Sequence, residues 1–418
     1  MQHVAAVGYS TRSAAESLHV AGLRVTAIDA FCDEDTRRVA QCMEISDWPH
    51  GIIETVAVSQ PDAVLLCGGM ETQVDVVRQI ERRCRLLGPT AEQIKQLRDP
   101  LVWAAAVDDC EGIRIPNTYS GSDRRWLAAR NTRLDDVATN DERWLLKSLS
   151  GAGGLHITEC SFASGVQQLS VDEDHHAAPR LLQQFVSGRV IGVVWYLGYD
   201  SVELCGAVQA WNANEWPAPL SFQYRGSFGP LLLNNLQSER LKHFGSALQQ
   251  ETAACGLIQA DFIEDTDGNL FLLEVNPRWT AGIEILEAEH ATSMCTRYTT
   301  SRSQSVSVPF MDQFSTRAAK AIYYSPFDLR LTTSMLRELQ SFGRDRFRIG
   351  RAVGEALWFL SDLPPVAESN VDFSQGSPVL TIQARIDRSL SENDDRDRLL
   401  NQLRAGYEQV ARLTRSDR

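Results

Sequence analysis

The first hundred residues alternate short apolar runs with segments of helical periodicity. The apolar runs at 3–8, 23–29 and 61–69 have the length of strands, while 10–22 and 70–88 repeat apolar residues at helical spacing. Strands that alternate with helices in this way usually pair in parallel and carry the helices on the faces of the sheet. The sequence therefore predicts a parallel α/β sheet at this end of the chain.

Beyond residue 98 the pattern favours strands separated by glycine-rich turns. A helix is expected at 99–110, a break at 112–121 and a strand at 143–147. Residues 180–211 have the pattern of an antiparallel meander, and 236–256 that of a helix.

The last third of the chain mixes strands with a final helix. Strands are predicted at 318–325 and 377–386, and the closing helix is rich in Asp, Arg and Leu. The polar stretch "TSRSQSVSVP" at 300–309 marks a possible boundary before this part.

The segment 257–280 predicts a hairpin with an unusual polar face. Two strand patterns flank Asp267-Gly268, a dipeptide favoured in two-residue turns. With that turn as the centre, Asp261 lies opposite Glu274 and Gln259 lies opposite Asn276. Because side chains alternate faces, Glu274, Asn276 and Arg278 point the same way, whereas Leu273 and Val275 share the other face with Ala260 and Phe262.

Two carboxylates placed across a ladder repel each other unless a positive charge lies between them. Mg²⁺ takes carboxylate and carbonyl oxygens and often bridges to phosphates. We therefore interpret Asp261, Glu274 and Asn276 as metal ligands, with Arg278 nearby for an anion. The alternative is a half-exposed hairpin whose polar face is simply solvated.

Composition narrows the class of protein. The 418 residues are 43% apolar and 23% charged, with a net charge of −13, which is unfavourable for a nucleic-acid surface. Since no run reaches the length of a membrane span and residues 1–13 lack a signal-peptide pattern, we expect a cytoplasmic protein. The nine cysteines form no CxxC pair, which favours reduced cysteines over disulfides or a zinc site.

A glycine-rich segment follows the strand at 143–147. Lys147 ends that strand, and Gly151, Gly153 and Gly154 would let backbone N–H groups approach an anion. The segment is not a Walker A loop, because GK[ST] is missing and the lysine precedes the glycines. It is either a phosphate-binding loop or an ordinary turn. The start "GYSTRS" likewise departs from the GxGxxG of dinucleotide sites.

Taken in order, the strand lysine, the "SLSGAGG" loop, "QQFVSG" at 183–188 and "ADFIEDTDGNLFLLEVNPR" resemble the ATP-grasp superfamily. The resemblance covers residues 1 to about 300, and the βαβ start resembles the domain that precedes the grasp in biotin carboxylase and D-Ala–D-Ala ligase. The C-terminal extension resembles a less characterised branch of predicted ATP-dependent ligases. Together these resemblances imply an α/β and α+β fold in three parts. These are a Rossmann-like pre-ATP-grasp domain at 1–98, an ATP-grasp domain at 99–300 with lobes 99–185 and 186–300, and a C-terminal extension at 301–418.

The resemblance also implies roles for individual residues. Lys147 would contact the α- and β-phosphates of ATP, and the loop Gly151, Ala152, Gly153 and Gly154 would cover the triphosphate. The adenine would meet Gln183, Gln184, Phe185 and Val186, with Gln183 offering its carbonyl and Val186 its N–H. Asp261, Glu274 and Asn276 would hold two Mg²⁺ ions, for which Mn²⁺ is an alternative. Arg278 would steady the γ-phosphoryl group or an acyl phosphate.

Some positions depart from the family pattern or have no clear counterpart. Many relatives carry an acid where Gln184 stands, so details of the adenine pocket are open. Lys95 and Arg98 are both candidates for an additional cation at ATP. Arg225, in "YRGSFGP", is either a ligand for a carboxylate or acyl phosphate, or an ordinary loop residue.

Such a site predicts an ATP- and Mg²⁺-dependent ligase that activates a carboxylate as an acyl phosphate and joins it to an amine. Arg278, Lys147 and Arg225 would be its catalytic cations. The alternatives are other ATP-grasp chemistry (carboxylation through carboxyphosphate, thiol ligation or a kinase) and a catalytically silent nucleotide-binding protein. The expected partners are a small carboxylate and a small amine, and we expect no binding of nucleic acid or membrane. A homodimer is one expected form of assembly. One-carbon cofactor synthesis is a further, weaker association. The sequence leaves open whether residues 310–418 complete the ATP-grasp domain, dimerise or cover the substrate entrance.

Overall fold

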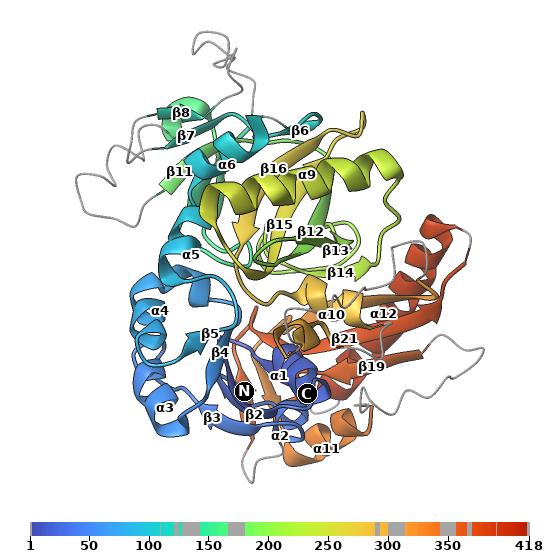
Figure 1. Cartoon of the computed structure of the whole chain (residues 1–418). Helices are drawn as coiled ribbons and strands as arrows, with labels where there is room; N and C mark the ends of the chain where they lie inside the picture. The colour runs from blue at the N-terminus through green and yellow to red at the C-terminus, as the bar shows by residue number, and fades with distance from the viewer. Residues whose placement is uncertain are drawn as a thin grey trace.

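The computed structural model describes residues 2–108, 110–120, 125–127, 143–165, 180–288, 293–299, 314–342, 357–365, 370–389 and 391–415. It has a substantial content of both helices and strands, arranged around three larger sheets (Figure 1). The expected boundary stretch at 300–309 lies entirely outside the described residues.

The N-terminal part is the predicted parallel sheet, in the order β3-β2-β1-β4-β5. Its strands are β1 (His3–Val7), β2 (Arg24–Asp29), β3 (Gln41–Glu44), β4 (Ala63–Leu66) and β5 (Arg85–Leu86). The helical segments that accompany or follow them are α1 (Arg12–Val20), α2 (Glu34–Arg37), α3 (Ile52–Ser59), η1 (Met70–Thr72), α4 (Val74–Glu81), α5 (Ala91–Leu97) and α6 (Pro100–Asp108). The single helix expected at 70–88 is wrong in its extent. The chain leaves the helix at Glu81, and Arg85-Leu86 adds an edge strand beside β4.

A second sheet has the order β10-β9-β11-β7-β8. Its strands are β7 (Thr118–Ser120), β8 (Arg125–Leu127), β9 (Trp144–Ser148), β10 (Ile157–Cys160) and β11 (Arg180–Gln184). The expectation of one meander across 180–211 is therefore wrong. The strand β11 pairs with β9 and β7, whereas the next strand joins a different sheet after the turn at Gly188.

The third sheet has nine strands in the order β19-β21-β17-β14-β13-β12-β15-β16-β6. They are β6 (Ile113–Arg114), β12 (Arg189–Leu197), β13 (Val202–Ala210), β14 (Gly226–Gly229), β15 (Gly256–Glu264), β16 (Leu270–Asn276), β17 (Thr316–Tyr324), β19 (Leu357–Ser361) and β21 (Pro378–Asp387). A separate pair joins β18 (Leu329–Leu331) to β20 (Val371–Phe373). Strands from the last third of the chain thus extend the sheet that carries the predicted metal hairpin.

The remaining helical segments are α9 (Asn235–Thr252), α10 (Ala281–Glu287), η2 (Met294–Tyr298), α11 (Thr333–Ser341) and α12 (Glu392–Arg415). Leu241, Phe244 and Leu248 of α9 pack in the main core with Trp195 and Phe262. Ile283, Ile285 and Leu286 of α10 pack instead with Leu18 of α1 and Val208 of β13. The helix α10 therefore joins the large sheet to the N-terminal part (Figure 1).

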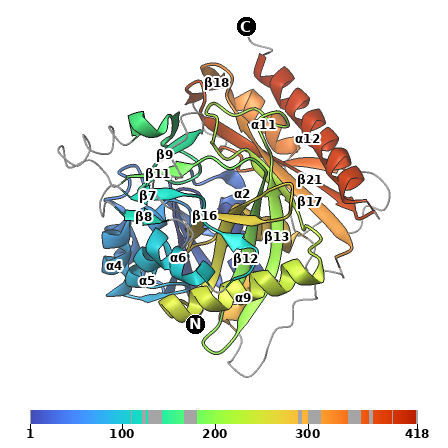
Figure 2. The same cartoon turned by 90° about the horizontal axis from the view of Figure 1, so that it is seen from above.

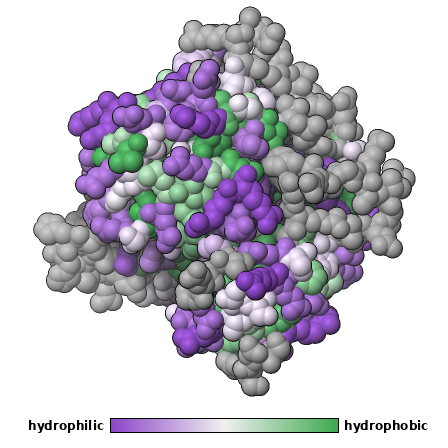
Figure 3. Space-filling model, turned by 90° about the horizontal axis from the view of Figure 1, so that it is seen from below, coloured by the Kyte–Doolittle hydropathy of each residue, from purple (hydrophilic) through white to green (hydrophobic). Residues whose placement is uncertain are grey.

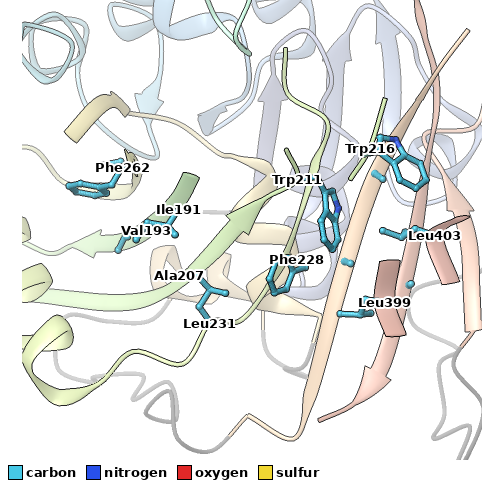
Figure 4. Packing of buried hydrophobic residues seen from close by; sticks show 14 of the residues in the cluster. Ile191, Val193, Ala207, Trp211, Trp216, Phe228, Leu231, Phe262, Leu399 and Leu403 are labelled. Carbon is cyan, nitrogen blue, oxygen red and sulfur yellow. The ribbon is translucent and has the colours of Figure 1, made fainter. Parts of the chain in front are cut away.

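The C-terminal helix α12 covers the far end of the large sheet, where it contacts β17, β19 and β21 (Figure 2). Leu399 and Leu403 point from this helix into the core, near Trp211, Trp216 and Phe228 (Figure 4). The rings of Trp211 and Phe228 stack with centroids 4.9 Å apart. Continuous packing of this kind places the last strands and α12 in the same core as β12–β16.

The molecular surface is mixed. On the face in Figure 3, apolar residues form separate groups between polar ones. Within the described parts of the chain, no helix combines the length and apolar character needed to cross a bilayer.

Candidate active site

The hairpin predicted to bind metal has the expected register at Asp261 and Glu274, although its turn is different. Asp261 pairs with Glu274, and Gln259 with Asn276. The ladder ends at Glu264 and Leu270, so the loop has five residues and only Gly268 takes a positive φ, of 79°. A bulge between Asp261 and Phe262 shifts the pairing by one residue and compensates for the longer loop.

The bulge corrects the expected pairing on the apolar side. Phe262 pairs with Leu272, and Leu273 is the extra residue. Leu272 and Val275 are buried in the core, whereas Leu273 is only partly buried. The polar face is unaffected, because Glu274 and Asn276 lie on the site side of the bulge.

The two carboxylates are tied together through an amide. The Asn276 Nδ2 group donates to Asp261 Oδ2 at 2.9 Å and to Glu274 Oε1 at 3.3 Å. Gln259 Nε2 donates to Asp261 Oδ1 at 2.6 Å, and Gln259 Oε1 accepts from Thr280 Oγ1. The Asn276 NH₂ group therefore faces both carboxylates. A 180° rotation of this amide would place its oxygen beside the two carboxylates, where all three groups could bind one cation.

Lys147 reaches this pair from the other sheet. Its Nζ donates to Gln183 Oε1 at 2.6 Å, and its charge interacts with those of Glu274 and Asp261. Burial lowers the pKa of Lys147, while the two carboxylates act in the opposite direction. The site thus lies between the second and third sheets, with one cation and two acids contributed from opposite sides.

The arrangement fits Mg²⁺ together with a phosphate ligand. Among the described residues, no three His, Cys, Asp or Glu side chains group as a metal site. The hairpin offers two carboxylates and an amide, and Mg²⁺ is commonly held by one or two carboxylates with phosphates completing its coordination. The donor set therefore suits a metal–nucleotide complex.

Protonation of Asp261 gives a pH prediction. Burial raises the pKa of Asp261 to about 7, and the charge of Glu274 acts in the same direction. This folded-state pKa lies above the ordinary value of 3.8, so the folded protein binds the proton of Asp261 more tightly than the unfolded chain does. The contribution of Asp261 to the free energy of unfolding therefore falls as pH rises from about 4 to 7 in metal-free protein. Cation binding needs the charged form, so the apparent Kd for Mg²⁺-ADP should rise up to about tenfold per pH unit below pH 7.

Calorimetry in buffers of different ionisation enthalpy would measure both the affinity and the proton release. An Asp261→Asn variant should lose the pH dependence together with most of the metal affinity. A Kd that is constant between pH 5.5 and 7.5 in the wild type would contradict this account.

Arg278 is held by two parts of the chain. Its Nη2 donates to Asn276 Oδ1 at 3.3 Å, and its Nε donates to Glu71 Oε1 at 2.6 Å. Glu71 belongs to η1, and its side chain is fully buried. The backbone N–H of Trp279 donates to the Leu66 carbonyl, which fixes the segment after the hairpin against β4.

The role of Glu71 was missed by sequence reasoning. Its position in η1, the segment that follows the carboxyl end of β4, is the available signal, because ligand sites of α/β sheets gather at the carboxyl ends of parallel strands.

The glycine-rich loop is closed against the segment 222–224. The N–H of Tyr224 donates to the Gly153 carbonyl at 3.0 Å, and a Cβ added at Gly154 would overlap the Phe222 carbonyl oxygen. Arg98 Nη2 donates to the carbonyls of Leu149 and Gly151 at 2.6 and 3.2 Å. Of the two further cations suggested by the sequence, Arg98 therefore contacts the loop, whereas Lys95 is exposed on α5.

Gly154→Ala should displace this loop. Gly154 has a φ of +77° and no room for a side chain, so we expect the KM for ATP to rise at least about tenfold. Gly153→Ala is the matched control, since Gly153 has a φ of +63° but no atom within 4 Å of an added Cβ. Equal effects in the two variants would mean that backbone strain, and not the contact with Phe222, is responsible.

Arg225 is buried without an acidic partner. It is 7% exposed, and no carboxylate in the described part of the chain forms an ion pair with it. Its Nη1 and Nη2 groups donate to the carbonyls of Gln223 and Leu220, and its Nε has no partner. Burial lowers the pKa of this guanidinium. A buried, unpaired cation next to the closed loop is suited to bind an anion.

The segment predicted to bind adenine lies at the end of β11. Gln183 is buried in the middle of the sheet, where its residue partners are Leu145 and Thr118 and its side chain supports Lys147. The N–H groups of Gln184 and Phe185 donate to Asn117 and Arg143. Val186 follows directly, and the adenine contacts of Gln183 and Val186 stay predictions.

Comparison with known proteins identifies one domain family in this chain. Residues 109–282 match the family of the ATP-grasp domain. No curated protein gives a significant match to the sequence.

Three solved structures illustrate the shared fold. The biotin carboxylase domain of Hydrogenobacter thermophilus 2-oxoglutarate carboxylase, a dimer with MgADP, ADP and bicarbonate, is 12% identical, with a TM-score of 0.63 over 93% of this chain and 86% of that chain. Campylobacter jejuni biotin carboxylase in its β,γ-ATP complex is 11% identical, with a TM-score of 0.64 over 94% and 89%. N5-carboxyaminoimidazole ribonucleotide synthetase from Thermus thermophilus is 15% identical, with a TM-score of 0.61 over 100% and 99%. At such low sequence identity, these structures show a shared fold only. The expected resemblance to the ATP-grasp superfamily is confirmed.

Proposed function

Because residues 109–282 form an ATP-grasp domain within a chain of ATP-grasp fold, we propose that this protein is an ATP- and Mg²⁺-dependent ligase joining a carboxylate to an amine. The observation that carries the proposal is the Asp261–Glu274 pair, which faces Lys147 and is followed along the chain by Arg278. Structures of this fold bound to ADP or MgADP support the choice of nucleotide.

Each residue of the site would have a distinct role in phosphoryl transfer. Asp261, Glu274 and Asn276 would hold Mg²⁺, which supplies charge neutralisation on the phosphates when bound. Lys147 would bind the α- and β-phosphates, and the closed loop at 151–154 would exclude water. Arg225 would bind the substrate carboxylate, whose oxygen attacks the γ-phosphorus while ADP leaves.

Arg278 would steady the acyl phosphate that results from this attack. The amine nitrogen then attacks the acyl carbon, an amide bond forms and phosphate leaves. Glu71 acts as a positioning residue, because its carboxylate fixes the Arg278 guanidinium at 2.6 Å.

The test is ADP release from Mg-ATP with pooled carboxylates, with and without pooled amines and amino acids. Release that requires both an acid and an amine would establish the ligase. Release that requires bicarbonate would favour carboxylation, the second candidate, because two of the structures of this fold are carboxylases or their domains. ATP binding with no release from any pool would favour a silent nucleotide-binding protein.

Lys147→Ala should act mainly on nucleotide binding. Loss of a cation that contacts phosphates should raise the Kd for ATP about tenfold, measured by calorimetry. Lys242→Ala on α9, where Nζ lies 3.1 Å from Glu239 on the surface, is the control and should leave the Kd unchanged. ATP affinity of wild-type strength in the Lys147 variant would remove this lysine from the site.

The same proposal includes domain boundaries at residues 98 and 300. It also includes assembly of the chain into a homodimer. The Hydrogenobacter thermophilus domain is described as a dimer. Light scattering on the purified chain would measure the mass of the assembly.

A further inference from the structure

Three aromatic side chains gather at the carboxyl edge of the N-terminal parallel sheet. Tyr9 follows β1, Phe31 follows β2 and Trp48 follows β3. The Tyr9 ring meets Phe31 edge-on at 5.2 Å between centroids and meets Trp48 edge-on at 5.6 Å. Tyr9 is nevertheless 50% exposed, and Phe31 and Trp48 are only partly buried, so this aromatic cluster keeps ring surface open.

The cluster is held rigidly by its backbone. The N–H of Tyr9 donates to the Gly68 carbonyl at 2.7 Å, and the N–H of Ala30 donates to the Tyr9 carbonyl at 3.3 Å. Gly69 has a φ of +91°, and a Cβ there would lie 3.1 Å from the Trp48 ring. Rings fixed in this way lose little conformational entropy when a ligand binds.

Asp29 fixes the same loops and makes a dinucleotide an unsuitable occupant. Its carboxylate accepts from the N–H and hydroxyl of Thr11 and from the N–H groups of Phe31 and Cys32. An acid at the end of the second strand recognises a ribose in dinucleotide sites. Here four internal donors already occupy its oxygens.

The cluster is continuous with the proposed active site. A Cβ added at Gly68 would lie 4.0 Å from the Arg278 guanidinium, and the carbonyl of the same residue accepts the N–H of Tyr9 at 2.7 Å. Gly68 therefore contacts the backbone of Tyr9 and lies beside the Arg278 guanidinium. A single small substrate could reach from the Tyr9 ring to Arg278.

We propose that Tyr9, Phe31 and Trp48 bind a planar aromatic or heteroaromatic ring carried by one of the two substrates that the ligase joins. The proposal rests on the proposed function, and it assigns the substrate class of that site. Aromatic rings prefer edge-on or offset contact with one another, and such pairs add to the free energy of apolar burial. The alternative is that the three rings only cap the sheet.

The test compares aromatic substrates with saturated ones of the same size. ADP release would be measured for phenethylamine against cyclohexylethylamine with pooled acids, and for phenylacetate against cyclohexylacetate with pooled amines. We expect kcat/KM at least tenfold higher for the aromatic member of one pair, and that pair identifies whether the amine or the acid carries the ring. Equal values in both pairs would overturn the proposal while the ligase stands.

Variants separate a binding role from a structural one. Tyr9→Leu should raise the KM of the preferred aromatic substrate at least tenfold with an unchanged KM for ATP, and Tyr9→Phe should retain wild-type values. Tyr199→Leu, at a tyrosine that is 68% exposed in the turn after β12, should change neither constant. A Tyr9→Leu variant with wild-type KM for the aromatic substrate would overturn the proposal.

A binding measurement keeps this proposal distinguishable from the proposed function. Calorimetric titration of the Mg-ADP-loaded protein with phenethylamine and with phenylacetate does not depend on turnover. Binding that Tyr9→Leu abolishes, without ADP release from any pool, would keep the ring site and reject the ligase. Absence of binding by both probes, in a protein that releases ADP with aliphatic pairs, would reject the ring site alone.

Discussion

Replacing Glu274 with alanine is expected to lower Mg²⁺-dependent ADP release about 1,000-fold or more and to leave the fold intact. Metal coordination would lose one of its two carboxylates, and charge stabilisation worth several kcal/mol corresponds to a rate factor of this size. Stability should change in the other direction. Glu274 lies across the ladder from Asp261, so its removal relieves a like-charge contact in the metal-free protein.

Both effects are measurable on the same variant, by ADP release at saturating Mg-ATP and by urea unfolding without metal. Asp267→Ala removes a carboxylate from the exposed turn of the same hairpin and should leave turnover and unfolding close to wild type. Turnover in the Glu274 variant equal to that of the Asp267 variant would exclude Glu274 from the metal ligands.

Arg12→Leu is expected to reduce the free energy of unfolding by about 3–5 kcal/mol at neutral pH, because it leaves buried carboxylates without their cation. Arg12 is 2% exposed and contacts Glu284 at 2.6 Å, Asp362 at 2.6 Å, Glu16 at 3.0 Å and Asp35 at 3.6 Å. Lys320 supports the same group by contacting Glu284 at 2.5 Å.

The loss should be smaller at pH 5 than at pH 8. Burial raises the pKa of Asp35 to about 7 even with Arg12 present, so acid neutralises part of the unpaired charge. Arg78→Leu is the matched control, since Arg78 forms an exposed helical pair with Asp75 at 2.7 Å and such pairs contribute little. Urea unfolding curves of the two variants at both pH values would check this, and similar midpoints would show that the Arg12 cluster is not needed for stability.

Sequence reasoning found the hairpin of the site because the information is local. The alternation of side chains places Glu274 and Asn276 on one face, and the turn brings them opposite Asp261 and Gln259 within 20 residues of chain. The prediction held at the site even though the turn type was wrong, since the bulge at Asp261/Phe262 restored the register. No sequence pattern predicts that bulge.

Lys147 and the glycine loop were also found from local sequence, because the lysine ends a strand and the glycines follow it within a few residues. The sequence did not predict which residues contact them. Gly154 is constrained by the Phe222 carbonyl, and Gln183 is bound to Lys147 from a neighbouring strand. These contacts depend on how strands and loops that are distant in the sequence pack together.

The sequence by itself determined the parallel N-terminal sheet, the acidic hairpin and the family resemblance, because strand and helix periodicity and turn chemistry act over a few residues. Tertiary structure alone decided that Glu71 holds Arg278, that Arg12 meets Asp362 at a separation of 350 positions, and that Tyr9 stands beside Trp48. Each of these contacts joins side chains from different elements. Their geometry follows from the packing of whole sheets and helices, which is set by burial of the shared core and leaves no periodic signal in the chain.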